Sequence, residues 1–195
     1  MRLFFFVPRP GPSRADFNLR FFYGRENSGS DPIDAMDGPK TLVLSEATWN
    51  EISRHAQDEF PDECCGVVLS DGTTDRVQRL INIQNQLHAL DPQTYPRTAA
   101  IAYAMDYKEL ESVIDNANRS GARLKAFYHS HPNHDAYFSP EDKAFASPFD
   151  EPTFPGAAQI VVSIYDRTVR RVAAFAWSNE KKDFIEVPVA KAPQI

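Results

Sequence analysis

The chain has 195 residues, the length of one domain with some additional sequence and too short for two full domains. Apolar residues make up 42% of it and charged residues 25%, close to the globular average, so its bulk is expected to be neither disordered nor fibrous. The net charge of −6 argues against a nucleic-acid-binding protein that works through a broad basic face.

The sequence predicts neither a secretory segment nor a membrane span. The apolar run Leu3–Val7 is shorter than the roughly 7–15 residues of a signal-peptide core, and a proline-rich stretch follows it. No run approaches the ~20 apolar residues of a membrane span. The two cysteines, Cys64 and Cys65, are adjacent, so they build no disulfide framework. We expect a soluble, cytoplasmic protein.

Residues 1–40 differ in composition from the rest of the chain. Prolines are dense enough there to prevent a regular helix or a central strand. The aromatic patch Phe17–Tyr23 is too apolar to be left free in water without cause, and we expect it to dock on the main domain or on a partner. We therefore divide the chain into a flexible or docked extension (1–40), a main domain (41–190) and a short tail (191–195).

Regular patterns begin at Thr41. The first predicted elements are a strand at Thr41–Leu44, a helix at Glu46–Phe60, and strands at Cys65–Leu69 and Val77–Ile83. Ser45 is a favourable N-cap for the helix, and Pro61 ends it. Asp71-Gly72 is a turn signal between the two later strands. A long polar loop is expected from the end of the Val77–Ile83 strand to Arg97.

The second half of the chain continues to interleave helices and strands. The predicted elements are an extended segment at Ala99–Ala104, a helix capped by Asp106 and ending at Arg119, a strand at Leu124–Tyr128, a short helix from Ser139, a hairpin of Ile160–Tyr165 with Val169–Trp177, and an edge strand at Phe184–Val189. Several neighbouring strands are hairpin-like. The fold class is therefore α/β or α+β, with a mixed, largely antiparallel sheet.

The chemistry-bearing residues are concentrated after the strand at Leu124–Tyr128. His129 and His131 are two residues apart, so both imidazoles project from the same face of an extended chain. Asp142 follows in the first turn of the next helix. Two imidazoles and one carboxylate, with a fourth position left open, are the ligands that a catalytic zinc ion requires.

The joint pattern resembles the JAMM (MPN+) metalloprotease family. Its motif is His-Ser/Thr-His-Pro, six residues, Ser, two residues and Asp, and this chain has His129-Ser130-His131-Pro132 followed at that spacing by Ser139 and Asp142. The upstream segment 61–66, Pro-Asp-Glu-Cys-Cys-Gly, is similar to the family's Pro-x-Glu-x-Cys-Gly box. The resemblance covers Thr41 to Val189 and implies a single JAB/MPN domain with a cytidine-deaminase-like fold.

The resemblance also implies a role for each residue of the motif. His129, His131 and Asp142 would bind Zn²⁺, and Glu63 would be the general base that takes a proton from the attacking water. Ser139 would donate a hydrogen bond to the oxyanion. Two further expectations come from position in the chain. Ser130 points to the other side of its strand and has a packing or supporting role, and His55 lies mid-helix on the surface.

Members of this family cleave the amide or isopeptide bond after the C-terminal Gly-Gly of a ubiquitin-fold protein. The resemblance therefore implies a ubiquitin-like or sulfur-carrier partner, with no nucleic acid and no membrane as partners. Glycine has no side chain, so a diglycine tail fits a narrow groove that other sequences would not enter. The loops Asn82–Arg97 and Ser147–Pro155 are candidate walls of such a groove.

Three other functions remain open on the sequence alone. Some relatives keep this fold without the metal ligands and serve as non-catalytic scaffolds or interaction modules. A RadC-like relative connected with DNA carries a similar His-x-His-Pro, although the acidic balance of this chain argues against it. Catalysis by a thiol of Cys64 or Cys65 would need a neighbouring base. The identity of the ubiquitin-like partner and the oligomeric state stay undetermined.

Overall fold

The structure is a computed structural model that describes residues 37–148 and 150–192. The strands are β1 (Leu42–Leu44), β2 (Cys65–Ser70), β3 (Asp75–Leu80), β4 (Arg123–Pro132), β5 (Ala158–Tyr165), β6 (Thr168–Ser178), β7 (Asp183–Val187) and β8 (Val189–Lys191). The helices are α2 (Glu46–Glu59), α3 (Gln84–Leu90), α4 (Tyr107–Arg119) and α5 (Pro140–Ala146).

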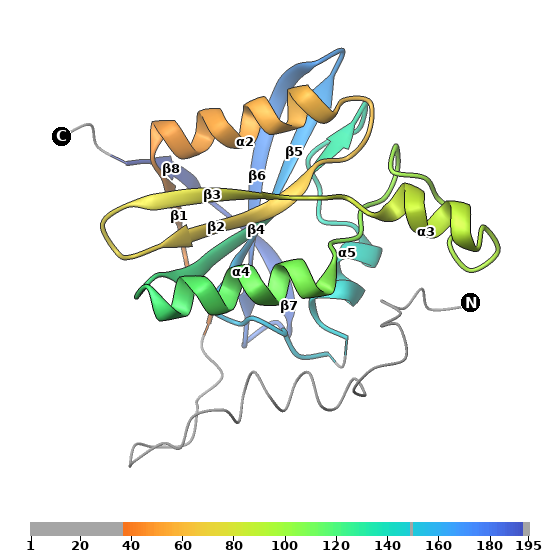
Figure 1. Ribbon diagram of the computed structural model, residues 1–195. Coiled ribbons are helices and arrows are strands. Elements are labelled where there is room, and N and C mark those ends of the chain that lie inside the picture. Colours follow the sequence, from red (N-terminus) through yellow and green to blue (C-terminus); the bar gives the residue numbers. More distant parts are fainter. Residues whose placement is uncertain (1–36, 149, 193–195) are drawn as a thin grey trace.

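The centre of the molecule is a six-stranded sheet with the strand order β3-β2-β4-β5-β6-β7. Neighbouring strands are antiparallel except for β4 and β5, which run parallel. A small second sheet pairs β1 with β8. Helix α2 lies along one face of the main sheet and α4 along the other (Figure 1). The predicted fold class, a mixed and largely antiparallel sheet flanked by helices, is confirmed.

Local sequence signals account for most element boundaries. The Ser45 side chain accepts a hydrogen bond from the Thr48 backbone N–H at 3.1 Å, and Asp106 accepts one from Glu109 at 3.0 Å, as expected of N-caps. Asp71 accepts hydrogen bonds from two backbone N–H groups of the turn between β2 and β3. The turn between β5 and β6 places Asp166 and Arg167 at positive φ, the geometry of a tight hairpin.

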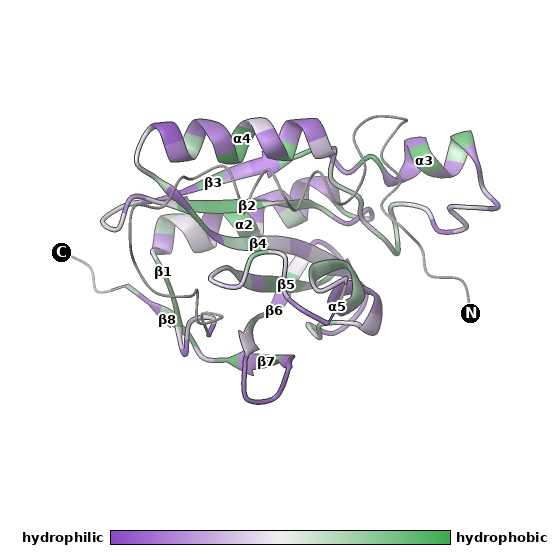
Figure 2. Ribbon diagram, turned by 90° about the horizontal axis from the view of Figure 1, so that it is seen from below, coloured by the Kyte–Doolittle hydropathy of each residue, from purple (hydrophilic) through white to green (hydrophobic). Residues whose placement is uncertain are grey.

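Apolar side chains form separate clusters on the two faces of the sheet. The first joins α2 to the even-numbered residues of β4 and β5, and includes Ile52, Tyr128 and Ile160. On the other face, one cluster lies under α4 and another lies over β5, β6 and β7. Figure 2 shows why β2 is central and β3 is not: β2 is almost uniformly hydrophobic, whereas β3 is mostly hydrophilic.

Five predicted segments need correction. The polar loop before Arg97 contains helix α3, and Ala99–Ala104 turns at its start and joins no strand. The edge strand ends at Val187, because Val189 already pairs with Leu42 of β1. The strand expected at Val77–Ile83 begins at Asp75 and ends at Leu80, in register with β2. The strand expected at Leu124–Tyr128 is longer, because its C-terminal half pairs with β5.

The division into extension, main domain and tail stays a prediction. The aromatic patch Phe17–Tyr23 and most of residues 1–40 lie outside the described residues. Within the described part, Gly38 donates a backbone hydrogen bond to Trp177, and Asp37 accepts one from Asn179, so residues 37–38 run beside the end of β6. None of the helices in the described ranges is long and apolar enough to cross a membrane.

Candidate metal centre

Alternation along β4 separates a polar pair from the main core. Tyr128 and Ser130 point toward the α2 side of the sheet, whereas His129 and His131 project from the opposite face. Cys65 of β2 pairs with His129 on one side, and β5 pairs with both histidines on the other. The histidine side chains are therefore held on a central strand, and the two residues are only 1% and 6% exposed.

Asp142 completes a cluster with the two histidines. His129 Nε2 and His131 Nε2 lie 3.0 Å apart, and Asp142 Oδ2 lies 3.6 Å from the first and 3.9 Å from the second. One ligand atom from each residue lies within 4.8 Å of the other two, so the three side chains could hold a metal ion. Two imidazoles and a carboxylate are a typical zinc donor set.

The position of Asp142 is fixed by the start of α5. Ser139 and Asp142 form a reciprocal capping box: Asp142 N–H donates to Ser139 Oγ at 3.1 Å, and Ser139 N–H donates to Asp142 Oδ2 at 2.9 Å. Burial opposes ionisation of this carboxyl, but the attraction of His129 and the hydrogen bonds that His129 and Ser139 make to the carboxylate outweigh it and hold the pKa of Asp142 well below its ordinary value. The carboxylate is therefore charged at neutral pH.

The two histidines differ in their electrostatics. Burial alone would lower the pKa of His129, but the carboxylate of Asp142 raises it overall. Burial and the neighbouring His129 lower the pKa of His131 to about 4. His131 Nδ1 lies 3.0 Å from the carbonyl oxygen of Asp135, which requires the proton on Nδ1 and leaves Nε2 as the lone-pair donor toward the cluster.

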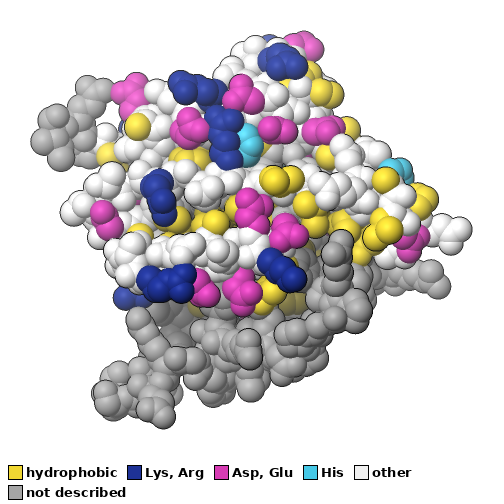
Figure 3. All heavy atoms as spheres, in the orientation of Figure 1, with side chains coloured by type: hydrophobic (Ala, Val, Ile, Leu, Met, Phe, Trp, Pro, Cys, Tyr) yellow, Lys and Arg dark blue, Asp and Glu magenta, His cyan; other side chains and the backbone are white. Residues whose placement is uncertain are grey.

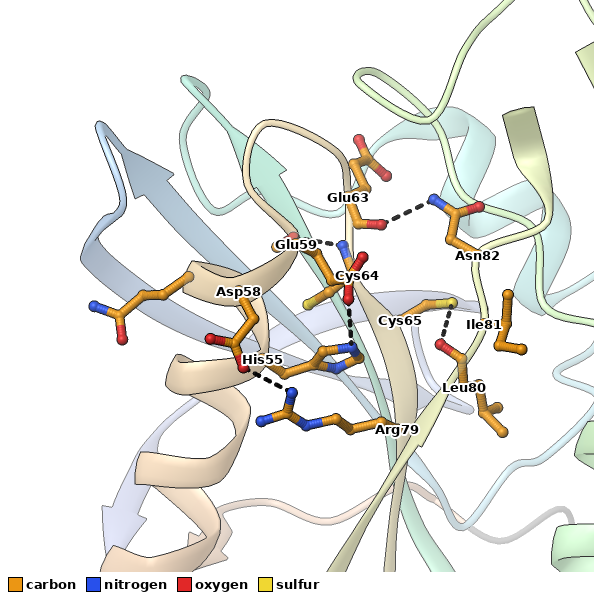
Figure 4. A network of polar contacts seen from close by, with 12 residues as sticks. His55, Asp58, Glu59, Glu63, Cys64, Cys65, Arg79, Leu80, Ile81 and Asn82 are labelled. Carbon is orange, nitrogen blue, oxygen red and sulfur yellow. Dashed lines mark hydrogen bonds and ion pairs between the residues drawn. The ribbon is translucent and has the colours of Figure 1, made fainter. Parts of the chain in front are cut away.

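Glu63 lies in the turn between α2 and β2, beside the cluster. Glu63 is 7% exposed, and burial raises the pKa of its carboxyl to about 8. The charge of His129 lowers this pKa, and that of Asp142 raises it. Its backbone N–H donates to the carbonyl of Ala99 at 2.7 Å, and its carbonyl accepts from Asn82 Nδ2 at 2.9 Å (Figure 4). The chain therefore places a carboxyl that is readily protonated near neutral pH next to the three ligand candidates.

Aromatic rings line the cluster on both sides. Tyr103 stacks on the imidazole of His129, with a centroid distance of 4.4 Å and an interplanar angle of 22°. Phe145 of α5 lies edge-on against Tyr103, and Tyr137 lies edge-on against His131. Tyr137 and Phe145 are exposed, at 49% and 45%. The cluster is therefore bordered by rings that are themselves partly open to solvent.

Ser130 connects the Glu63 turn to β4, in line with the predicted supporting role. Its Oγ accepts a hydrogen bond from Cys64 N–H at 2.8 Å, and its own N–H donates to the Cys64 carbonyl at 3.1 Å. Gly66 leaves room for the side chain of Tyr128 on the neighbouring strand β4, since a Cβ at this position would lie 2.5 Å from the ring and hydroxyl of Tyr128. The three residues after Glu63 are thus each paired with a residue of β4.

The prediction that His55 lies on the surface is wrong. The residue is only 4% exposed, and its Nδ1 lies 2.8 Å from the hydroxyl of Tyr128, so the helix turns this polar side chain into the core. Burial and, to a lesser degree, Arg79 lower the pKa of His55 to about 4. Burial also raises the pKa of Cys64 to about 12, which keeps this thiol protonated and unsuited to nucleophilic catalysis.

The structure brings His129, His131, Asp142, Glu63 and Ser139 into one site, from β4, α5 and the turn before β2. Two residues near the site, Asn82 and Tyr103, have no role in the sequence-based assignment. Their signal in the sequence is weak, because a single Asn after a strand and a Tyr in an irregular segment are common. The loop Asn82–Arg97 does approach Glu63, through Asn82.

Comparisons with known proteins identify the family of the chain. Residues 45–179 match the family described as prokaryotic homologs of the JAB domain. Desampylase from Haloferax volcanii is 28% identical over 153 residues, which span 76% of this chain and 95% of that protein.

One solved structure supports the similarity in fold. The solution structure of a protein from Desulfitobacterium hafniense superposes with a TM-score of 0.58 at 21% identity, covering 79% of this chain and 94% of that chain. A JAB1/MPN domain protein from Archaeoglobus fulgidus gives a TM-score of 0.43 at 17% identity, covering 76% and 98%. The family match runs from the N-cap of α2 to the residue after β6, and all five residues of the site lie within it. The chain therefore belongs to the family of prokaryotic homologues of the JAB domain.

Proposed function

We propose that the protein is a zinc-dependent metallopeptidase that hydrolyses the amide or isopeptide bond after the C-terminal Gly-Gly of a ubiquitin-like or sulfur-carrier protein. The observation that carries the proposal is the cluster of His129, His131 and Asp142 with the buried carboxyl of Glu63 beside it. Similarity to a desampylase supports the substrate class.

The donor set fits Zn²⁺. The cluster offers two imidazole nitrogens and one carboxylate oxygen, and Asp142 is held ionised, as a metal ligand must be. When bound, zinc polarises the scissile carbonyl and lowers the pKa of a coordinated water toward about 7. Asp135 fixes the tautomer of His131, so the protein presents one ligand nitrogen in the correct protonation state before any ion arrives.

Glu63 is the general base in this proposal. In the metal-free protein, a carboxyl with a pKa of about 8 is a stronger base than an ordinary glutamate and is mostly protonated at pH 7. A cation bound beside it would favour the ionised, basic form. It can therefore take the proton of the attacking water and give that proton to the leaving amine. Its backbone is bound on both sides by hydrogen bonds from neighbouring segments, which keeps the carboxyl at the cluster.

Ser139 stabilises the carbonyl oxygen as negative charge develops on it. Its Oγ accepts a hydrogen bond from Asp142 N–H, which uses a lone pair and leaves the hydroxyl proton to be donated. The same capping box positions the ligand Asp142, so donor and ligand are fixed relative to each other by one turn of helix. A preorganised donor of this kind is worth about 10²–10³ in kcat in other hydrolases.

A slender substrate tail suits the surroundings of the cluster. Tyr103 covers one face of His129, and Tyr137 stands against His131, so side chains on an approaching peptide would meet aromatic rings. A diglycine segment brings no side chains and adopts either extended or turn dihedrals. These contacts support, on physical grounds, the preference for a Gly-Gly tail.

The test is hydrolysis of a ubiquitin-like protein that ends in Gly-Gly and is joined to a lysine side chain or a short peptide. The zinc-loaded protein should release the intact modifier, and a chelator should stop the reaction until zinc is returned. The same substrate with Gly-Gly changed to Ala-Ala should be cleaved far more slowly. A protein that purifies without stoichiometric metal and leaves the conjugate intact would instead be a non-catalytic scaffold.

A further inference from the structure

Asn82, which follows β3, uses every hydrogen-bonding position of its side-chain amide. Its Nδ2 donates to the carbonyl of Glu63 at 2.9 Å and to that of Ala102 at 3.1 Å. Its Oδ1 accepts from the backbone N–H of Gln84 and of Ala104, each at 3.0 Å. Two donors and two acceptor positions are all that an asparagine amide has.

The four partners belong to three separate segments of the chain. Glu63 lies in the turn before β2, Gln84 begins α3, and Ala102 and Ala104 lie on either side of Tyr103. A backbone bridge between Asn82 and Met105 runs alongside these bonds. Figure 4 shows the Asn82 amide pointing at the Glu63 carbonyl from the segment that follows β3. One side chain therefore joins the Glu63 turn to the segment that carries Tyr103.

Both joined segments touch the metal cluster. Tyr103 stacks on His129 at a centroid distance of 4.4 Å, and the Glu63 carboxyl interacts electrostatically with His129 and Asp142. The ligands themselves come from β4 and α5, which make no hydrogen bond to the Asn82 side chain among the described residues. Asn82 thus bears on the groups around the cluster and not on the ligands directly.

We propose that Asn82 is a positioning residue that fixes Glu63 and Tyr103 relative to His129, an inference that rests on the proposed function for its catalytic consequence. In a hydrolase that relies on one general base, a displacement of about 1 Å can cost up to 10²-fold in rate. Removing the amide donors frees the Glu63 carbonyl and the carbonyl beside Tyr103 at once. Glu63 and Tyr103 are then no longer held by the same side chain.

The central test is the isosteric variant Asn82→Asp, which removes the two donors and keeps the acceptor oxygen. We expect kcat with a diglycine-linked substrate to fall about 10- to 100-fold, KM to change by less than about threefold, and zinc content to stay stoichiometric. Asn116→Asp is the matched control, since it makes the same chemical change on the exposed side of α4, and it should behave as the unmodified protein. Asn82→Ala removes all four bonds without adding charge and should lose at least as much kcat.

A second readout needs no activity. In the metal-free protein, nuclear magnetic resonance should show that Asn82→Asp shifts the ring resonances of His129, which the current of the stacked Tyr103 ring displaces. The Glu63 amide, which donates to Ala99, should exchange its hydrogen at least about tenfold faster. Asn116→Asp should leave both signals unchanged.

The outcomes separate the two proposals. Unchanged kcat, or lost activity with normal His129 and Glu63 signals and reduced zinc, would overturn the positioning role and leave Asn82 as a structural residue only. An unmodified protein that cleaves no diglycine conjugate, while Asn82→Asp still shifts His129 and Glu63, would overturn the proposed function and keep the placement of these groups by Asn82. A kcat loss together with both shifts supports the positioning role.

Discussion

At the scale of single residues, each group of the candidate site is held in place by a small number of contacts. Asp142 is a metal-ligand candidate and also a member of the capping box of α5. His131 is oriented by one backbone carbonyl, that of Asp135. Two hydrogen bonds hold the backbone of Glu63, so its carboxyl can carry the proton transfer of the reaction. Substitutions at these residues therefore separate metal binding from proton transfer.

Glu63→Gln should keep the fold and the metal but lose nearly all hydrolysis. The change is nearly isosteric, and it removes a buried carboxyl whose ionisation burial disfavours, so the melting temperature should not fall. General base catalysis contributes typically 10²–10⁴-fold, and kcat should drop by that amount. Turnover of a diglycine conjugate and zinc content are measured side by side. Near-normal turnover would show that another group is the base.

Asp142→Asn should weaken metal binding, because it removes the anionic ligand candidate. Ser139→Ala is the matched control, since it breaks the same capping box at a cost of about 1 kcal/mol and keeps all three ligands. Metal analysis after equilibrium dialysis should therefore show a loss for Asp142→Asn and full occupancy for Ser139→Ala. A stoichiometric zinc content in a His129→Ala, His131→Ala double variant would show that the ligand assignment is wrong.

At the scale of elements, helix α2 packs a polar contact into the main core. His55 reaches the Tyr128 hydroxyl, and a Cβ at Gly66 would collide with that same tyrosine. On its outer side, α2 is bound to β3 by Arg79, which forms an ion pair with Asp58 at 2.8 Å (Figure 4). Arg79 forms a second ion pair with Glu51, also at 2.8 Å. The helix that precedes Glu63 is thus attached to both β4 and β3.

This packing predicts acid sensitivity. The folded state lowers the pKa of His55 from 6.5 to about 4, mainly by burial, while the unfolded chain keeps the ordinary value. Between these pH values the unfolded state holds more protons, so stability is full above about pH 6.5 and is lost as the pH falls toward 4. The loss is on the order of 3 kcal/mol.

Denaturant unfolding of the metal-free protein at pH 7 and pH 4.5 measures this loss. His55→Gln, which cannot take up a proton, should show a smaller drop in the free energy of unfolding between the two pH values. The other titrating groups, His131 included, are the same in both proteins and cancel in the comparison. An equal drop in the two proteins would mean that His55 does not titrate differently on folding.

The sequence predicts an element well where the signal is local. The caps at Ser45, Asp106 and Ser139 and the turn at Asp71-Gly72 are each specified by side chains within a few residues, and all of them occur. Helix α3 escapes prediction because its N-cap Ile83 makes no side-chain cap hydrogen bond and the helix is held from Asn82 instead. Strand β4 exceeds its apolar run because β5 pairs with its polar end.

The candidate site divides in the same way. The ligand set follows from spacing, since alternation in a strand and the first turn of a capped helix are both local rules. The contributions of Asn82 and Tyr103 depend on contacts with residues about 20 and 26 positions away, to Glu63 and His129 respectively, and no local pattern encodes them. His55 follows the same logic, because its partner Tyr128 is on a distant strand.

At the scale of the whole molecule, the site lies at a seam between two parts of one sheet face. Helix α4 covers the part over β2 and β4, and the segment around Phe138 covers the part over β5, β6 and β7. His129 lies between these clusters, since Tyr103, which packs against the first, stacks on its ring, and Phe138 of the second lies 6.4 Å from it, centroid to centroid. On the face shown in Figure 3, positive and negative side chains are interspersed, without a broad basic surface.

A metal ion in this seam would join β4 to α5 and stabilise the whole fold. The ligands come from β4 and from α5, which are separated by an irregular segment, and only the folded chain brings them together. A ligand that binds the folded state alone adds about 2.7 kcal/mol at 100 times its dissociation constant. For a chain of this size, that corresponds to a rise in melting temperature of about 5–10 °C.

Thermal unfolding of chelator-treated protein with added Zn²⁺ should show this rise, and His131→Ala, which lacks one of the three ligand candidates, should not. Mg²⁺ is the metal control, because it prefers oxygen ligands in octahedral geometry and should produce no comparable shift. Glu63→Gln should respond to zinc as the unmodified protein does, since it changes the base and not a ligand. A zinc-induced rise of equal size in His131→Ala would place the ion elsewhere on the molecule and remove the physical basis of the proposed hydrolysis.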